Sequence, residues 1–138
     1  MNPYRAYQQQ RLFGWTRIDM LLALYERALA LLDQARTALH SQHAQAAQPL
    51  LSEARLVVYG LVAGVNPELG ELPQNFLRLY DYVLHRIRSG SVAAVEDASR
   101  ILHTLYEALQ EIRAEAVQLE RSGAIPPVEG NQALHATV

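Results

Sequence analysis

Four long stretches of the chain repeat apolar side chains every three or four residues. The first begins at Thr16 and ends near Leu39, and the others span about residues 44–63, 73–89 and 92–122. This period is that of an α-helix with one apolar stripe facing a core. Four such helices with short links and no strand pattern predict an all-α fold, an antiparallel up-down four-helix bundle.

Residues with local reasons to begin a helix mark several of the expected boundaries. Thr16 precedes Asp19 by three positions, which is the spacing of a capping box. Ser91 is the expected N-cap of the fourth helix. Pro49 favours a start of the second helix nearer Gln48, because proline suits the first helical position.

The chain has 138 residues, a length typical of one domain. Residues 1–15 place aromatic side chains between polar ones and predict an N-terminal cap segment that packs on the bundle. Residues 16–122 are the predicted four-helix bundle. Residues 123–138 begin with Gly123, contain a proline pair and predict a flexible C-terminal tail.

Charge and composition exclude several classes of function. The formal net charge is −2 and there is no Cys, so neither a basic surface for nucleic acid nor a disulfide is expected. The longest nearly uncharged apolar stretch, residues 20–25, is far shorter than the roughly 20 residues that span a bilayer. The first residues also lack the apolar segment of a signal peptide. We therefore expect a cytoplasmic protein with no nucleic-acid partner and no membrane insertion.

Patterns that would indicate catalysis or metal binding are missing from the sequence. There is no Glu-x-x-His motif of a di-iron bundle, no phosphate-binding glycine loop and no metal-ligand spacing among the histidines. No catalytic residue, metal or cofactor is therefore expected, and Asp81 and His85 predict a local ion pair. One enzymatic alternative is a ribonuclease, because Arg78 and His85 on one helix loosely resemble the pair of the HEPN family.

Three of the predicted helices carry more apolar residues than a core requires. A core-facing helix needs about three apolar positions in seven. The additional residues are Met20, Leu24, Leu31, Leu77, Tyr82, Leu84, Ile101 and Ala108. A large apolar surface usually marks a binding site, either for a second copy or for a partner helix. A wide core stripe with a few surface leucines is the alternative interpretation.

Two segments resemble the flagellar secretion chaperone (FliS) family. The first begins at Tyr7 with YQQQRL and continues into the run MLLALYERAL, which ends at Leu29. The second, Asn75–Ile87, reads NFLRLYDYVLHRI and is similar to the family's Asn-(x)3-Leu-Tyr-Asp-Tyr helix. Their separation also matches, so the resemblance covers about residues 4–121. The sequence departs from the family at Arg17, where a proline is usual.

The resemblance implies a non-catalytic export chaperone that is a monomer or a weak dimer. Such a chaperone binds the disordered C-terminal region of flagellin along hydrophobic grooves, prevents premature polymerisation and delivers flagellin to the export gate component of the flagellar secretion system. Tyr7 and Leu12 are implied as cap residues that the partner displaces. The implied groove residues are Leu21, Leu24, Asn75, Tyr80, Tyr82 and Arg86. Core packing remains an alternative role for Leu21 and Tyr80, and surface ion pairing for Arg86.

Overall fold

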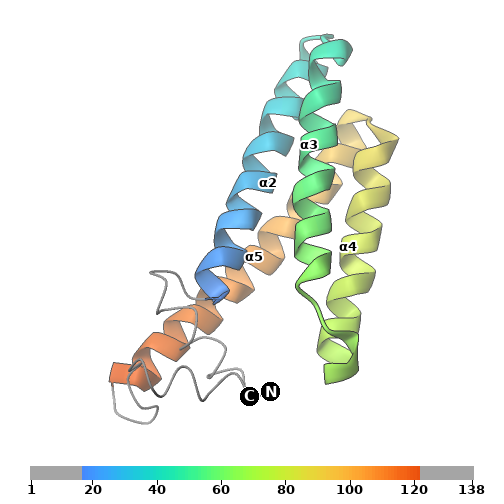
Figure 1. Ribbon diagram of the computed structural model, residues 1–138. Coiled ribbons are helices and arrows are strands. Elements are labelled where there is room, and N and C mark those ends of the chain that lie inside the picture. The colour runs from blue at the N-terminus through green and yellow to red at the C-terminus, as the bar shows by residue number, and fades with distance from the viewer. Residues whose placement is uncertain (1–16, 122–138) are drawn as a thin grey trace. The chain divides into compact units, whose positions relative to one another are not determined.

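The helical periodicity of the sequence corresponds to four α-helices. The computed structural model describes residues 17–121. In chain order these contain α2 (Arg17–His40), α3 (Ala44–Ala63), the 3₁₀ helix η1 (Pro67–Leu69), α4 (Glu71–Ser89) and α5 (Val92–Arg121) (Figure 1). There is no strand in this part of the chain, which confirms the predicted all-α class. The predicted cap segment and tail lie outside the described residues.

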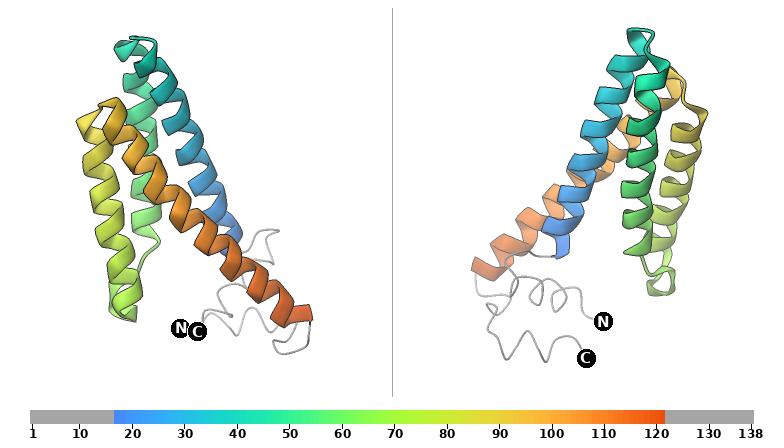
Figure 2. Two further views of the ribbon diagram at one scale, coloured as in Figure 1. Left: turned by 180° about the vertical axis from the view of Figure 1, so that it is seen from behind. Right: turned by 45° about the horizontal axis from the view of Figure 1, so that its top comes forward.

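Residues 24–105 form one compact unit that contains parts of all four α-helices. The links at residues 41–43 and 90–91 are very short. Helices joined by such short links lie next to each other and run antiparallel. Figures 1 and 2 show α3 beside both α2 and α4, and the first turns of α5 beside the last turns of α4. This unit is therefore an up-down four-helix bundle, as predicted.

A second unit contains the two ends of the chain, residues 1–23 and 106–138. Its described residues are the first turns of α2 and the last turns of α5. Within this unit the Arg113 guanidinium of α5 donates a hydrogen bond to the Asp19 carboxylate of α2.

One apolar stripe from each helix builds the core of residues 24–105. A residue with no exposed surface represents each stripe: Leu32, Val58, Val83 and Leu102. Burying a side chain of this kind stabilises the fold by about 1.5–3 kcal/mol. The stripes are wider than the sequence pattern suggested. Leu31 and Leu84, expected on a second face, are 1% and 9% exposed and belong to the core.

The link between α4 and α5 has the expected local chemistry. The Ser91 hydroxyl accepts a hydrogen bond from the Ala94 N–H at 3.1 Å, which confirms Ser91 as a cap. Gly90 ends α4 with a φ of 75°, a left-handed conformation that a Cβ atom disfavours.

Two helices contain a proline near their start, and both begin before it. The predicted span of about residues 44–63 is confirmed for α3. The prediction that α3 begins nearer Gln48 is wrong, because α3 begins at Ala44 and Pro49 lies inside it. Proline has no N–H, so Pro49 cannot make the helical hydrogen bond to the carbonyl of Gln45, four residues earlier. Both Pro49 and Gln45 are exposed. Likewise α4 begins two residues before Pro73. Pro73 therefore lies in the first turn, where a backbone N–H needs no partner within the helix.

Across residues 17–121, no helix combines the length and apolar content that a membrane span requires.

Candidate partner-binding face

Tyr80, one of the implied groove residues, lies inside the bundle. It is 1% exposed, and its hydroxyl shares a hydrogen bond with that of Tyr25 on α2, which is fully buried. The Phe76 ring stands edge-on to the Tyr80 ring, with centroids 6.1 Å apart. Burial raises the pKa of both phenols, so both hydroxyls stay protonated in the folded protein. The pair therefore joins α2 to α4 through a polar contact that is satisfied within the core.

Tyr82 follows Tyr80 by two residues and points away from the core. Two residues turn a helix by about 200°, and Tyr82 is 45% exposed. Its hydroxyl donates a hydrogen bond to the Asp97 carboxylate of α5, with Oη and Oδ2 2.6 Å apart. The short motif Leu-Tyr-Asp-Tyr thus places one tyrosine in the core and the other on the surface.

Asp97 is the centre of a charged cluster between α4 and α5. Besides Tyr82, Arg86 donates to it through Nε, at 3.1 Å from Oδ2, and the Arg100 guanidinium donates to Oδ1. The hydrogen bond from Tyr82 lowers the pKa of Asp97, and the two guanidinium groups lower it further. The same hydrogen bond raises the pKa of Tyr82. The cluster holds α4 and α5 together at this level of the bundle and keeps Asp97 ionised at neutral pH.

Next to this cluster, one side of α4 exposes apolar side chains. Leu72, Phe76 and Leu79 recur at helical spacing on the side that also carries Asn75 and Tyr82. Leu72 is 65% exposed, and Phe76 and Leu79 are half-buried. We call these five residues the open α4 face.

The implied groove residues are therefore distributed over several places. Asn75, Tyr82 and Arg86 lie together on or beside the open α4 face, whereas Tyr80 lies in the core. Leu24 is half-buried on the side of α2 that carries the buried core residues. Leu21 is half-buried and belongs to the second unit. Tyr7 and Leu12 lie outside the described residues. Their roles remain predictions.

A second exposed apolar surface lies on α3, where the sequence interpretation did not expect one. Leu56 is 68% and Tyr59 is 46% exposed, and both lie on the side of α3 opposite the buried stripe. Residues 56–67 contain no charged side chain. The signal was present in the sequence as apolar residues half a turn away from Leu51, Ala54 and Val58.

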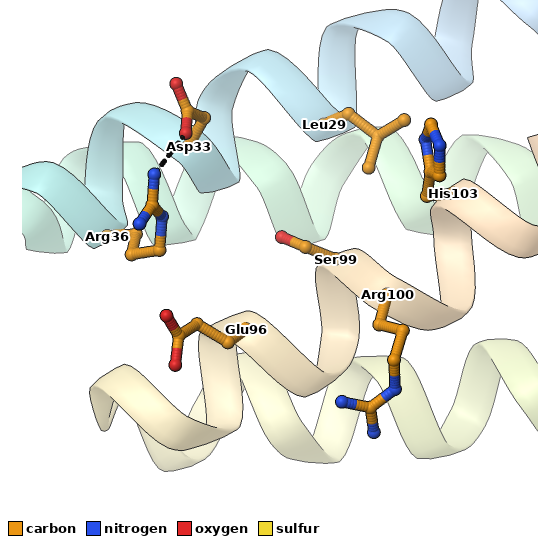
Figure 3. Close-up of a pocket in the computed structure, with 7 residues that line it drawn as sticks. All are labelled: Leu29, Asp33, Arg36, Glu96, Ser99, Arg100 and His103. Atoms are coloured by element: carbon orange, nitrogen blue, oxygen red, sulfur yellow. Dashed lines mark hydrogen bonds and ion pairs between the residues drawn. The ribbon is translucent and has the colours of Figure 1, made fainter.

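The structure also has a pocket of about 390 Å³ between α2 and α5. Its lining is drawn in Figure 3: Leu29, Asp33, Arg36, Glu96, Ser99, Arg100 and His103. Arg36 donates to Asp33 at 2.9 Å, and the Ser99 hydroxyl points away from the His103 ring.

Each residue of the pair considered for ribonuclease activity contacts another residue of α4. Arg78 bonds to Asn75, and the His85 Nε2 atom lies 3.9 Å from the Asp81 carboxylate, the ion pair predicted from the sequence. Arg78 and His85 are both exposed. No group of three or more potential metal ligands occurs among residues 17–121.

Comparison with known proteins agrees with the resemblance in the sequence. A family model described as "Flagellar protein FliS" matches residues 1–116. A search of curated proteins finds no match. The family match spans α2, α3 and α4 and most of α5, and therefore includes both exposed apolar surfaces.

Proposed function

We propose that this chain, which belongs to the FliS family, binds the C-terminal region of flagellin on the open α4 face. Members of this family are flagellar export chaperones for flagellin and not enzymes. Binding occurs in the cytoplasm, keeps flagellin from polymerising before export, and allows its delivery to the export gate component of the flagellar secretion system.

The observation that carries this proposal is the exposure of Leu72 beside the half-buried Phe76 and Leu79. Leu72 and Leu79 are seven residues apart, or about 10 Å along the helix axis. A partner helix of two turns with its own apolar stripe covers this length. Removing the exposed part of a leucine side chain from water contributes on the order of 1 kcal/mol.

Coupled folding and binding explains how such a complex is both specific and reversible. A disordered segment that becomes helical on the chaperone loses conformational entropy, which offsets part of the contact energy. While it is bound, its apolar stripe is not available to other flagellin molecules. The net affinity stays moderate, so the export apparatus can remove the client.

The test uses a synthetic peptide of the C-terminal region of flagellin from the same organism. We expect one-to-one binding in calorimetry together with a gain of helical circular dichroism. Leu72→Ser should weaken binding about tenfold, which corresponds to about 1.4 kcal/mol. Leu56→Ser on α3 is the matched control, because Leu56 and Leu72 are 68% and 65% exposed. Equal effects of the two variants, or no binding by the unaltered protein, would contradict the proposal.

A homo-oligomeric interaction protein is the second candidate, favoured by the uncharged outer surface of α3. In that case Leu56 and Tyr59 would pack against the same surface of a second copy. Light scattering over a dilution series distinguishes the two candidates. Dimers that persist on dilution and dissociate in Leu56→Ser, without any peptide binding, would favour this candidate over the chaperone.

A further inference from the structure

The charges around the open α4 face are unbalanced. Arg78 and Arg86 lie one helical turn before and one after Tyr82 along α4. Tyr82 and Arg86 form the edge of this face that contacts α5, the helix that carries Arg100. The acidic group in contact with this edge is Asp97. The cluster of Arg86, Arg100 and Asp97 therefore has a net charge of +1, since one carboxylate serves two guanidinium groups.

Arg86 is the member of this cluster that is best placed to meet a partner. Its side chain is 33% exposed, and it contacts Asp97 through Nε. Among the described residues, no other group takes a hydrogen bond from its two terminal nitrogens. Arg100 is more exposed, at 72%, so water screens its charge more strongly.

The other acidic groups near this face do not contact Arg86. Glu71 lies in the first turn of α4, 15 residues before Arg86. Asp81 lies on a different side of α4, 3.9 Å from His85. Glu96 lies on the side of α5 that faces α2, where its carboxylate is 3.9 Å from His40. None of these carboxylates forms an ion pair with Arg86, although Glu96 lies one helical turn before Arg100 and lines the same pocket.

We infer that the segment bound on the open α4 face presents a carboxylate to Arg86. This inference rests on the proposed function and adds the chemistry that the client needs at one end of its apolar stripe. A guanidinium with two available N–H groups in a plane suits the two oxygens of a carboxylate. The carboxylate belongs either to an acidic side chain of the client or to its C-terminus.

Arg86→Gln tests the pairing, and Arg88→Gln is the matched control. Arg88 is an exposed arginine in the same last turn of α4, but it lies on another side of the helix. The probe is the flagellin C-terminal peptide, with each acidic residue changed singly to its amide and with a further version amidated at its C-terminus. Calorimetry at low salt measures every combination.

We expect Arg86→Gln to weaken binding three- to tenfold and Arg88→Gln to change it less than twofold. One peptide version should bind the unaltered protein more weakly than the original peptide does. The same version should bind Arg86→Gln as tightly as the original peptide binds Arg86→Gln. That version identifies the carboxylate that pairs with Arg86. If Arg86→Gln acted only by disturbing the structure, it would weaken the binding of every peptide version by the same factor. Raising the salt concentration should also weaken the unaltered complex more than the Arg86→Gln complex.

Two results would overturn this inference, and they are distinguishable. If the unaltered protein binds the peptide but no peptide version is coupled to Arg86, the pairing is wrong and the proposed function stands. If the unaltered protein does not bind the peptide at all, the proposed function fails and this inference fails with it.

Discussion

Two tyrosines in one short motif have opposite surroundings. Tyr80 is 1% exposed, and its hydroxyl bonds to another buried phenol, whereas Tyr82 is 45% exposed, and its hydroxyl bonds to a carboxylate. Both connect α4 to another helix, Tyr80 to α2 and Tyr82 to α5. In the core such a contact has no competition from water, while on the surface water can replace it. We therefore expect Tyr80 to determine the stability of the fold and Tyr82 to belong to the binding surface.

The largest expected effect is that of Tyr80→Ala. Removing a fully buried aromatic ring leaves a cavity and should lower the free energy of unfolding by about 3–5 kcal/mol. Urea unfolding followed by circular dichroism measures it. Tyr82→Ala is the control and should cost less than about 1 kcal/mol, because its ring is half exposed. Similar losses in the two variants would mean that the contrast between the two tyrosines is wrong.

The next effect separates the hydroxyl from the ring. Tyr80→Phe removes the buried hydrogen bond between the Tyr80 and Tyr25 hydroxyls and should cost about 1 kcal/mol. The double variant Tyr25→Phe/Tyr80→Phe should cost less than the sum of the two single changes, because it removes both polar groups. Strict additivity in urea unfolding would show that the two hydroxyls do not depend on each other.

A smaller effect concerns pH and the charged cluster. The pKa of Asp97 is lowered in the folded protein, first by Tyr82 and then by Arg100 and Arg86. Its stabilising contribution is therefore present above its ordinary pKa of about 3.9 and is lost as the pH falls through the lower folded pKa. Asp97→Asn should flatten the dependence of thermal unfolding on pH below about 4. An unchanged dependence would contradict the assigned shift.

The smallest expected effect is that of Tyr82→Phe on stability. This variant loses the hydrogen bond to Asp97 but keeps the ring, and water can solvate the carboxylate that remains. The free energy of unfolding should change by about 0.5 kcal/mol or less in the same urea experiment. A loss as large as that of Tyr80→Phe would show that the Asp97 cluster is part of the structural core.

The sequence predicted the helices well because period and caps are local properties. Ser91 and the buried stripe of α3 are examples. The sequence pattern does not include Leu72 in a helix, because it predicts a helix that begins at Pro73. A proline in the first turn costs little, so α4 begins two residues earlier. The core role of Leu31 was also missed, since the width of a buried stripe depends on how neighbouring helices enclose it. The positions of Arg86 and Asp97 beside each other depend on the register between α4 and α5, which no local pattern specifies.

The most direct test of partner binding at the open α4 face is a titration followed by NMR of the leucine methyl groups. The flagellin C-terminal peptide is added to the protein, and the signals of Leu72, Leu79 and Leu56 are compared. We predict that the methyl signals of Leu72 and Leu79 shift until one peptide is bound per chain, while those of Leu56 stay in place. Shifts at Leu56 with unchanged signals at Leu72 and Leu79 would contradict binding at the open α4 face.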